Sequence, residues 1–244
     1  MARRLQAPSP AAFARDLERR IVGCTACPRL VEHCRHIAEV KRRAYRDENY
    51  WGRPVPTFGD PDPQLLVVGL APGAHGANRT GRVFTGDSSG DWLYRALHVT
   101  GFANQARSIG LDDGLQLRGA AVTCAGRCAP PQNKPARDEL ERCRPFLIEE
   151  LQAYRGLRVV LALGGIALDA VLKSWSAADF PEFSSKPKFV HGAVFSLDGA
   201  PTLVTCYHPS RQNTQTGRLT RRQFHAVFRR CRRLVDEGRA RERP

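Results

Sequence analysis

The feature that most constrains the fold is the stretch 65–93, where an apolar run leads into a long glycine-rich loop. Leu65–Val68 contains no polar residue, which predicts a strand buried on both faces, as in a parallel sheet. Residues 69–76 contain three glycines and a proline, a composition that excludes both helix and strand. The segment Ser88–Asp91 then resembles a helix start with an acid in its first turn.

This strand, loop and helix predict a ligand site, because open parallel sheets bind ligands beyond the carboxyl ends of their strands. A loop of about twenty residues between packed elements is typically either functional or disordered. Val83 and Phe84 lie among its polar residues and predict ordered contacts. A nucleotide-binding phosphate loop is disfavoured, since the glycine order fits neither common phosphate-loop motif and the loop contains no lysine.

The remaining chain alternates predicted strands and helices without an internal repeat. Further strands are expected at Ala120–Cys124, Arg158–Leu163 and a hairpin of Val194–Leu197 with Thr202–Thr205. This order predicts one α/β domain with a mostly parallel sheet, whose strand-to-helix loops meet at a common mouth. We expect residues 1–63 to form N-terminal helices and an extended lead-in, 64–236 the α/β core, and 237–244 a flexible tail.

The charge of the chain indicates a polyanionic partner. Its 244 residues are 42% hydrophobic, enough for one globular core, yet the net charge is +14. Such an excess favours phosphate contacts with counterion release. A GC-rich genome would explain why only five of the 38 basic residues are lysine, but not the excess of base over acid. No signal-peptide or membrane-length apolar stretch is present, so we expect a cytoplasmic protein without membrane contact.

Eight cysteines in such a compartment favour metal binding over disulfides. Cys24 and Cys27 form one close pair, and Cys128 and Cys143 form a second, wider pair. Four thiolates can hold zinc or an iron–sulfur cluster, and the wide second pair favours the cluster while leaving zinc open. The remaining cysteines are expected to be small buried apolar residues. They are Cys34, Cys124, Cys206 and Cys231.

Three motifs resemble the family 5 uracil-DNA glycosylases: GLAPGAHGANRTGRVFTGDSSGDWL, CAPPQNKP and HPSRQNTQTGRLT. The cysteine pattern resembles the four-iron, four-sulfur site of families 4 and 5. The resemblance extends from Cys24 to the C-terminal helix. It implies a three-layer α/β/α sandwich with a mostly parallel four-stranded sheet, and one structural [4Fe-4S] cluster on Cys24, Cys27, Cys128 and Cys143. The implied activity is that of a monofunctional DNA glycosylase, which excises uracil and other deaminated bases such as hypoxanthine and leaves an abasic site.

The reaction requires a flipped base, a pocket and a weakened glycosidic bond. Phe84 is expected to stack on the base, where an aromatic face contributes ~1–3 kcal/mol, and the loop amides to bind it. Asp87 would position water or steady the sugar cation, although it could be only a helix cap. His208 would donate a hydrogen bond to the leaving base as a neutral imidazole. The predicted base-binding residues are Gly69, Leu70, Ala71, Pro72, Gly73, His75 and Phe84, with Asn78 shaping the pocket.

Two positions depart from the wider superfamily. Ala71 stands where many relatives carry a water-activating polar residue, and Cys124 ends the strand where many carry an asparagine that reads pyrimidines. Asn133 is the nearest substitute and is expected to join Asp87 and His208 in catalysis. Losing a strict amide reader should relax base choice, because an unpaired polar group is what rejects wrong bases.

The expected partner is double- or single-stranded DNA containing uracil or another deaminated base, bound by a monomer at the nucleoid of a bacterial cell. The candidate DNA contacts are Arg79, Arg82, Arg211, Gln212, Asn213 and Arg218. Two alternatives stay open: an iron–sulfur or zinc DNA-binding protein without glycosylase activity, and a zinc-containing phosphoesterase. The first would leave the HPSRQN loop and the Phe84–Asp87 loop without a role, and the second would need more His and Asp residues near the strand ends than the sequence contains.

Overall fold

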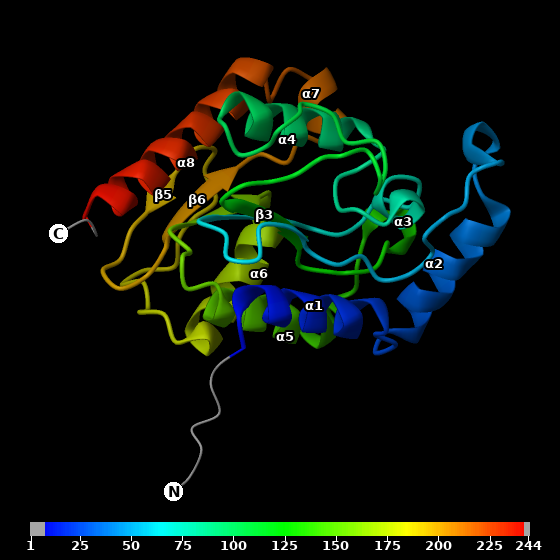
Figure 1. Ribbon diagram of the computed structural model, residues 1–244, viewed down its shortest axis with the longest axis horizontal. Coiled ribbons are helices and arrows are strands. Elements are labelled where there is room, and N and C mark those ends of the chain that lie inside the picture. Colours follow the sequence, from blue (N-terminus) through cyan, green and yellow to red (C-terminus); the bar gives the residue numbers. More distant parts are fainter. Residues whose placement is uncertain (1–7, 242–244) are drawn as a thin grey trace, which may run out of the picture.

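The computed structural model describes residues 8–241 and arranges them in three layers (Figure 1). A central sheet is covered by α4 and α8 on one face and by α1, α5 and α6 on the other. The α-helices are α1 (Pro10–Val22), α2 (Pro28–Val40), α3 (Ala77–Thr80), α4 (Ser88–Val99), α5 (Arg137–Ala153), α6 (Gly165–Trp175), α7 (Arg211–Gln215) and α8 (Arg221–Arg241). Short 3-10 turns are η1 (Arg43–Tyr45), η2 (Pro131–Asn133) and η3 (Ser176–Ala178).

The sheet has six strands in the order β1-β3-β2-β4-β6-β5. They are β1 (Phe58–Gly59), β2 (Leu65–Gly69), β3 (Ala120–Cys124), β4 (Val159–Leu163), β5 (Val194–Phe195) and β6 (Thr202–Cys206). The four central strands are parallel, as expected, and β5 pairs with β6 as the expected hairpin. The antiparallel edge strands β1 and β5 extend the predicted four-stranded sheet to six. Two residues are too few to give β1 a periodic sequence signal.

The central strands are buried because helices cover both faces of the sheet. Every residue of β2, β3 and β4 is buried. Alternate side chains of β2 enter opposite cores: Leu65 and Val67 pack with the α4–α8 side, and Leu66 and Val68 with the α5–α6 side. Burial on both faces explains why these strands read as continuous apolar runs rather than alternating ones.

The C-terminal helix is longer than the sequence indicated. In α8 the buried residues Phe224, Phe228, Cys231 and Val235 recur at helical spacing and hold it on the sheet. The helix runs to Arg241, so the prediction of a flexible tail from 237 is corrected for 237–241, while 242–244 lie outside the described residues. Within residues 8–241, no helix has both the length and the apolar character needed to span a bilayer.

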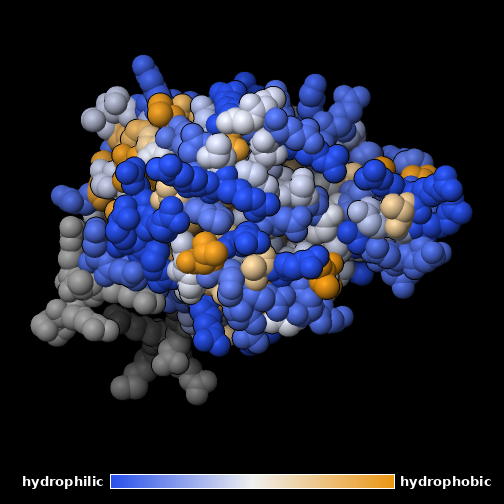
Figure 2. Space-filling model, turned by 90° about the horizontal axis from the view of Figure 1, so that it is seen from above, coloured by the Kyte–Doolittle hydropathy of each residue, from blue (hydrophilic) through white to orange (hydrophobic). Residues whose placement is uncertain are grey.

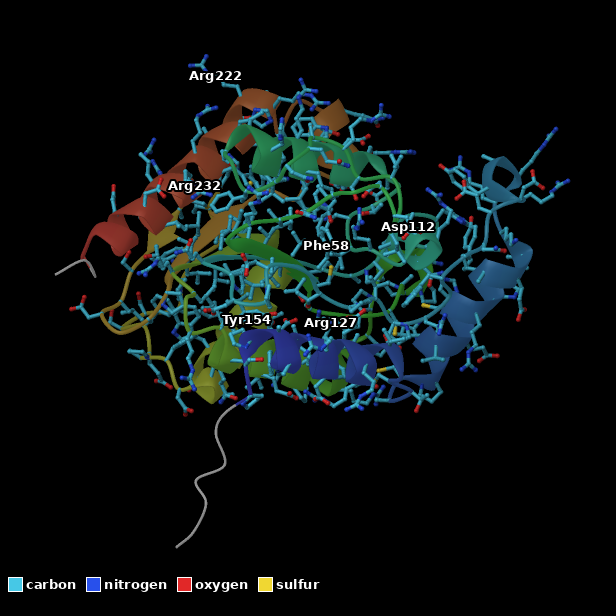
Figure 3. The ribbon with its side chains drawn as sticks, in the orientation of Figure 1. Phe58, Asp112, Arg127, Tyr154, Arg222 and Arg232 are labelled. Carbon is cyan, nitrogen blue, oxygen red and sulfur yellow. The ribbon has the colours of Figure 1, made fainter. Side chains whose placement is uncertain are left out.

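A buried ion pair joins three parts of the fold. Arg127, just after β3, contacts Glu150 of α5 at 2.7 Å between Nη2 and Oε2, and both side chains are 1% exposed or less. Arg127 also donates to the Thr57 hydroxyl at 2.7 Å, and the Thr123 hydroxyl donates to Glu150 at 3.1 Å. Arg127 lies on the side of the sheet that faces α1 and α5 (Figure 3). The pair therefore ties the lead-in, the β3 loop and α5 together.

Removing one partner of this pair should destabilise the fold strongly. Glu150→Ala leaves Arg127 charged and buried without a carboxylate, which typically costs about 3–5 kcal/mol. The free energy of unfolding from urea titration measures this. The matched control is Glu149→Ala, because Glu149 pairs with Arg20 at a side chain that is 35% exposed, where the loss should stay below about 1 kcal/mol. Equal losses in the two variants would contradict the assignment.

Candidate functional site

Loops from separate strands meet at the carboxyl edge of the sheet, as expected. The Ser89 hydroxyl, at the start of α4, donates to the Pro209 carbonyl after β6 at 3.1 Å. The Gly126 amide, after β3, donates to the Leu70 carbonyl at 2.9 Å. A Cβ placed on Gly164, after β4, would lie 3.6 Å from the Cβ of His208. These contacts form one mouth from the loops of all four central strands.

Asp87 caps α4 with one carboxylate oxygen and faces the glycine-rich loop with the other. Its Oδ1 accepts from the Gly90 amide at 3.0 Å. A Cβ added to Gly76 would lie 2.5 Å from Oδ2, and one added to Gly73 would lie 3.2 Å from it. Burial raises the pKa of Asp87, and the amides of Gly90 and Ser89 and the charge of Arg211 oppose that rise. The helix-cap role therefore coexists with an oxygen directed at the mouth.

Phe84 is held in a strained backbone conformation beside the end of β2. Its φ of +52° lies in the left-handed region, which non-glycine residues rarely adopt. The Tyr94 hydroxyl donates to the preceding Val83 carbonyl at 2.7 Å and helps to fix this turn. A Cβ on Gly69 would approach the Phe84 ring to 2.6 Å, so glycine is required there for the ring to fit. Phe84 is only 6% exposed.

His208 lies against Phe84 and is neutral at physiological pH. The two ring centroids are 5.6 Å apart with planes inclined by 31°. Burial lowers the pKa of His208 to about 4. The side-chain amide of Asn213 donates to the His208 carbonyl at 2.8 Å and fixes the loop that carries it. A neutral imidazole has one N–H to donate and one nitrogen to accept.

The other predicted pocket residues differ in their burial and in their hydrogen-bond partners. Pro72 is buried, whereas Leu70, Ala71 and Gly73 are half-buried around it. His75 contacts the Tyr50 hydroxyl through Nδ1 at 3.1 Å. The Asn78 side chain is fully buried and donates to the Cys34 carbonyl of α2 at 3.2 Å.

Two predicted DNA contacts are corrected. Arg79 is buried, forms an ion pair with Glu48 and donates to the His75 carbonyl. Arg82 is buried as well, with an ion pair of 2.8 Å to Asp113 and a hydrogen bond to the Leu111 carbonyl. Both guanidiniums are buried and engaged by a carboxylate and a backbone carbonyl, so they support the loop instead of facing phosphate. The sequence could not predict that these arginines are buried in ion pairs, because their partners lie about thirty residues away in the chain.

The remaining polar candidates lie at the surface. Arg211, Gln212 and Arg218 are exposed, and Arg218 stacks over the Tyr207 ring at 4.5 Å. Asn213 is half-buried and engaged with the His208 carbonyl, so its amide holds the loop instead of pointing outward. Asn133 is exposed in η2 with a φ of +56°.

Four cysteines from three segments line one cavity: Cys24, Cys27, Cys128 and Cys143. Cys24 and Cys27 precede α2, Cys128 follows β3, and Cys143 lies on α5. Arg127 and Arg142 line the same cavity. Within residues 8–241, no three His, Cys, Asp or Glu side chains converge closely enough to hold a single metal ion.

The other four cysteines are buried, as expected for small apolar residues: Cys34, Cys124, Cys206 and Cys231. Cys34 packs beside Cys128 but does not line the cysteine cavity. Cys124 lies against the end of β2, since a Cβ on Gly69 would be 3.2 Å from its sulfur. It therefore contributes to the floor beneath Phe84.

Sequence reasoning missed the residues that hold the mouth together. Ser89 joins α4 to the loop after β6, and Tyr94 supports the turn at Phe84. Ser89 was visible only as part of a helix-start signal. Tyr94 lies two turns into an amphipathic helix, where an aromatic residue is normally read as core.

Comparison with known proteins gives a consistent assignment. The family model described as "Uracil DNA glycosylase superfamily" matches residues 56–232. A type-5 uracil-DNA glycosylase from Thermus thermophilus is 49% identical over 88% of this chain and 95% of its own length. The type-5 enzyme from Mycobacterium leprae is 48% identical over 90% and 95%, and that from Pyrobaculum aerophilum 43% identical over 91% and 94%. A type-4 uracil-DNA glycosylase from Pyrobaculum aerophilum is 28% identical over 64% of this chain.

The lowered pKa of His208 gives a prediction for the folded protein. In NMR titration, the imidazole should stay neutral down to pH 5 and titrate near pH 4. Because the folded pKa lies below the usual value of about 6.5, the unfolded state binds the proton more readily. The stability contributed by neutral His208 is complete above about pH 6.5 and is lost as the pH falls towards 4. His208→Asn should remove the titrating signal and flatten this part of the stability profile; an imidazole titrating near pH 6.5 would contradict the prediction.

Proposed function

This chain belongs to the uracil DNA glycosylase superfamily, among relatives of type 5, and from that premise we propose that it removes uracil from DNA by hydrolysing the N-glycosidic bond. The product is an abasic site, and the chain acts as a monofunctional glycosylase. The observation that carries the proposal is the convergence of Phe84, Asp87 and His208 on one mouth, linked by the Ser89–Pro209 hydrogen bond.

Phe84 and His208 would bind the extruded base together. Their rings already contact each other at 5.6 Å, within the usual range for an aromatic pair, so a base does not fit between them as they stand. The base therefore stacks on Phe84 after the His208 ring has turned aside to meet the edge of the base. In that position a neutral His208 donates its N–H to the base carbonyl, where negative charge grows as the bond breaks.

Asp87 would act on the sugar side of the bond. One oxygen is occupied by the Gly90 amide, and the other faces the loop of Gly73 and Gly76. The free oxygen can orient water or stabilise the cationic sugar, while the amides of the loop bind the departing base. Ala71 offers no polar group for this task, so the carboxylate of Asp87 carries it, with Asn133 as a further group that approaches when DNA is bound.

The pocket floor supports a relaxed choice of base. The sulfur of Cys124, beside Gly69, offers only weak hydrogen bonding where an asparagine amide would read a pyrimidine. We expect hypoxanthine and other deaminated bases to be accepted with uracil, because Cys124 has no amide that a wrong base would leave unpaired. Double- and single-stranded DNA are both expected substrates, held in part by Arg211, Gln212 and Arg218.

The four cysteines fit a [4Fe-4S] cluster better than zinc. A single zinc with bonds of about 2.3 Å would draw four sulfurs to within about 4 Å of one another. The thiols share a cavity without converging in that way. Arg127 and Arg142 also line this cavity, where Arg127 is paired with Glu150 and Arg142 with Asp138. When bound there, the cluster supplies structural cross-linking. As ligands of that cluster, the four cysteines would anchor α2 and α5 to the β3 loop.

Replacing Asp87 with asparagine tests its role in the reaction. Asparagine keeps the cap oxygen for the Gly90 amide and caps helices as well as aspartate, but it removes the charge facing the loop. We expect single-turnover excision of uracil opposite guanine, at saturating enzyme, to slow ~100-fold or more. Abasic product is revealed by alkaline strand cleavage.

Asp91→Asn is the matched control, because Asp91 is an exposed first-turn acid of the same helix. It should excise uracil at the rate of the unaltered protein. A normal rate for Asp87→Asn would reassign the work to His208 and the loop amides. No uracil release by the unaltered protein would refute the glycosylase assignment.

Substitution of one cysteine tests the cluster. Cys128→Ser should lose iron and the broad visible absorbance of the purified protein, and its midpoint of thermal unfolding should fall. Cys34→Ser is the matched control, since Cys34 is buried beside Cys128 but outside the cysteine cavity. It should retain the full iron-to-protein ratio. Complete iron retention by Cys128→Ser, or zinc in place of iron, would overturn the assignment.

A further inference from the structure

Four basic side chains form a cluster where α4 packs on α8. Arg221, His225 and Arg229 recur every four residues and therefore share one face of α8. Arg95 of α4 lies close enough that its charge, with those of Arg229 and Arg221, adds to burial in lowering the pKa of His225. We name Arg95, Arg221, His225 and Arg229 the basic shoulder.

The arginines of the basic shoulder are not neutralised inside the protein. Elsewhere on α8, Arg232 lies 3.5 Å over the Phe102 ring and pairs with Asp236, and Arg230 donates to the Gly192 carbonyl. Across residues 8–241, by contrast, no carboxylate forms an ion pair with Arg95, Arg221 or Arg229. The nearest acid in sequence is the exposed Asp91, one turn before Arg95. Gathered like charges without counter-charges favour an anionic partner.

Aromatic rings hold part of this charge in fixed positions. The Arg221 guanidinium stacks over Trp92 at 4.8 Å, and Trp92 packs on Phe224 in turn. Arg218 stacks in the same way over Tyr207, the neighbour of His208. A planar guanidinium held on a ring loses little further freedom when it binds phosphate. Arg218 beside the mouth and Arg221 in the basic shoulder thus each hold positive charge against an aromatic ring.

The basic shoulder lies beside the mouth rather than in it. α4 begins directly after Asp87, and α8 begins shortly after the loop that carries His208, so both helices start at the mouth. The face that carries α4, α7 and α8 is dominated by hydrophilic residues (Figure 2). Arg222, next to Arg221, points away from the body of the protein into solvent (Figure 3). A duplex whose nucleotide enters the mouth would place its neighbouring phosphates on this side.

We propose that the basic shoulder binds backbone phosphates of the DNA duplex flanking the extruded nucleotide. This rests on the proposed function for the choice of polyanion, and it adds a contact outside the loops that hold the base. The contact reads no sequence, because guanidinium groups on phosphates fix position without touching base edges. It also predicts that binding gains from duplex length on one side of the lesion.

The test compares the variant Arg221→Gln/Arg229→Gln on two uracil-containing duplexes. One extends about two helical turns to each side of the uracil, and the other ends about half a turn from it. Dissociation constants are measured by fluorescence anisotropy over a series of salt concentrations, with excision followed on the same duplexes. The long duplex should bind about tenfold more weakly, and the slope of log affinity against log salt should shrink by about one for each arginine removed. The short duplex should bind nearly as before.

Arg15→Gln/Arg155→Gln is the matched control, since both side chains are exposed and belong to the α1–α5 side of the sheet. It removes the same charge and should keep the preference for the long duplex. Equal weakening on both duplexes, or a long-duplex affinity no lower than that of the control, would overturn the proposal. Those outcomes leave excision by the unaltered protein intact, whereas absence of uracil release would refute the proposed function instead.

Discussion

The packing of the β3 loop against α5 is built around a buried ion pair. Arg127 and Glu150 are both almost completely hidden from solvent, and each would be costly to bury alone. Together they fix the chain after β3 against α5, with further hydrogen bonds from Arg127 to the Thr57 hydroxyl and from the Thr123 hydroxyl to Glu150. Because Cys128 follows Arg127 directly and Cys143 lies on α5, the pair also sets how two of the four cysteines face each other.

At the mouth, contacts between loops likewise determine the position of each candidate reactive group. Asp87 satisfies the start of α4 and faces the glycine-rich loop at the same time. Ser89 then connects that helix start to the carbonyl that follows His208. A displacement of either loop would therefore shift both Asp87 and His208. A hydrogen bond thus joins segments of the mouth that lie more than one hundred residues apart in the chain.

Arginine serves two opposite purposes in this protein. Arg79, Arg82 and Arg127 are buried and neutralised, and they brace loops that have no regular structure of their own. Within residues 8–241, no carboxylate pairs with the arginines of the basic shoulder, and their side chains are exposed. Composition counts both kinds alike, so the net charge of +14 predicts a polyanionic partner without locating the surface that would meet it.

The sequence alone determined the parallel strands, the glycine-rich loop at a strand end, the four cysteines and the convergence of three motifs, because each leaves a local pattern. Tertiary structure alone decided which groups are free to act. Arg79 and Arg82 form ion pairs with Glu48 and Asp113, and the Asn213 amide donates to a backbone carbonyl. From the sequence, all three were candidate DNA contacts. Hydrogen bonds between residues distant in sequence carry no periodic signal. Only the folded chain could separate the arginines that brace the loops from those whose side chains are exposed.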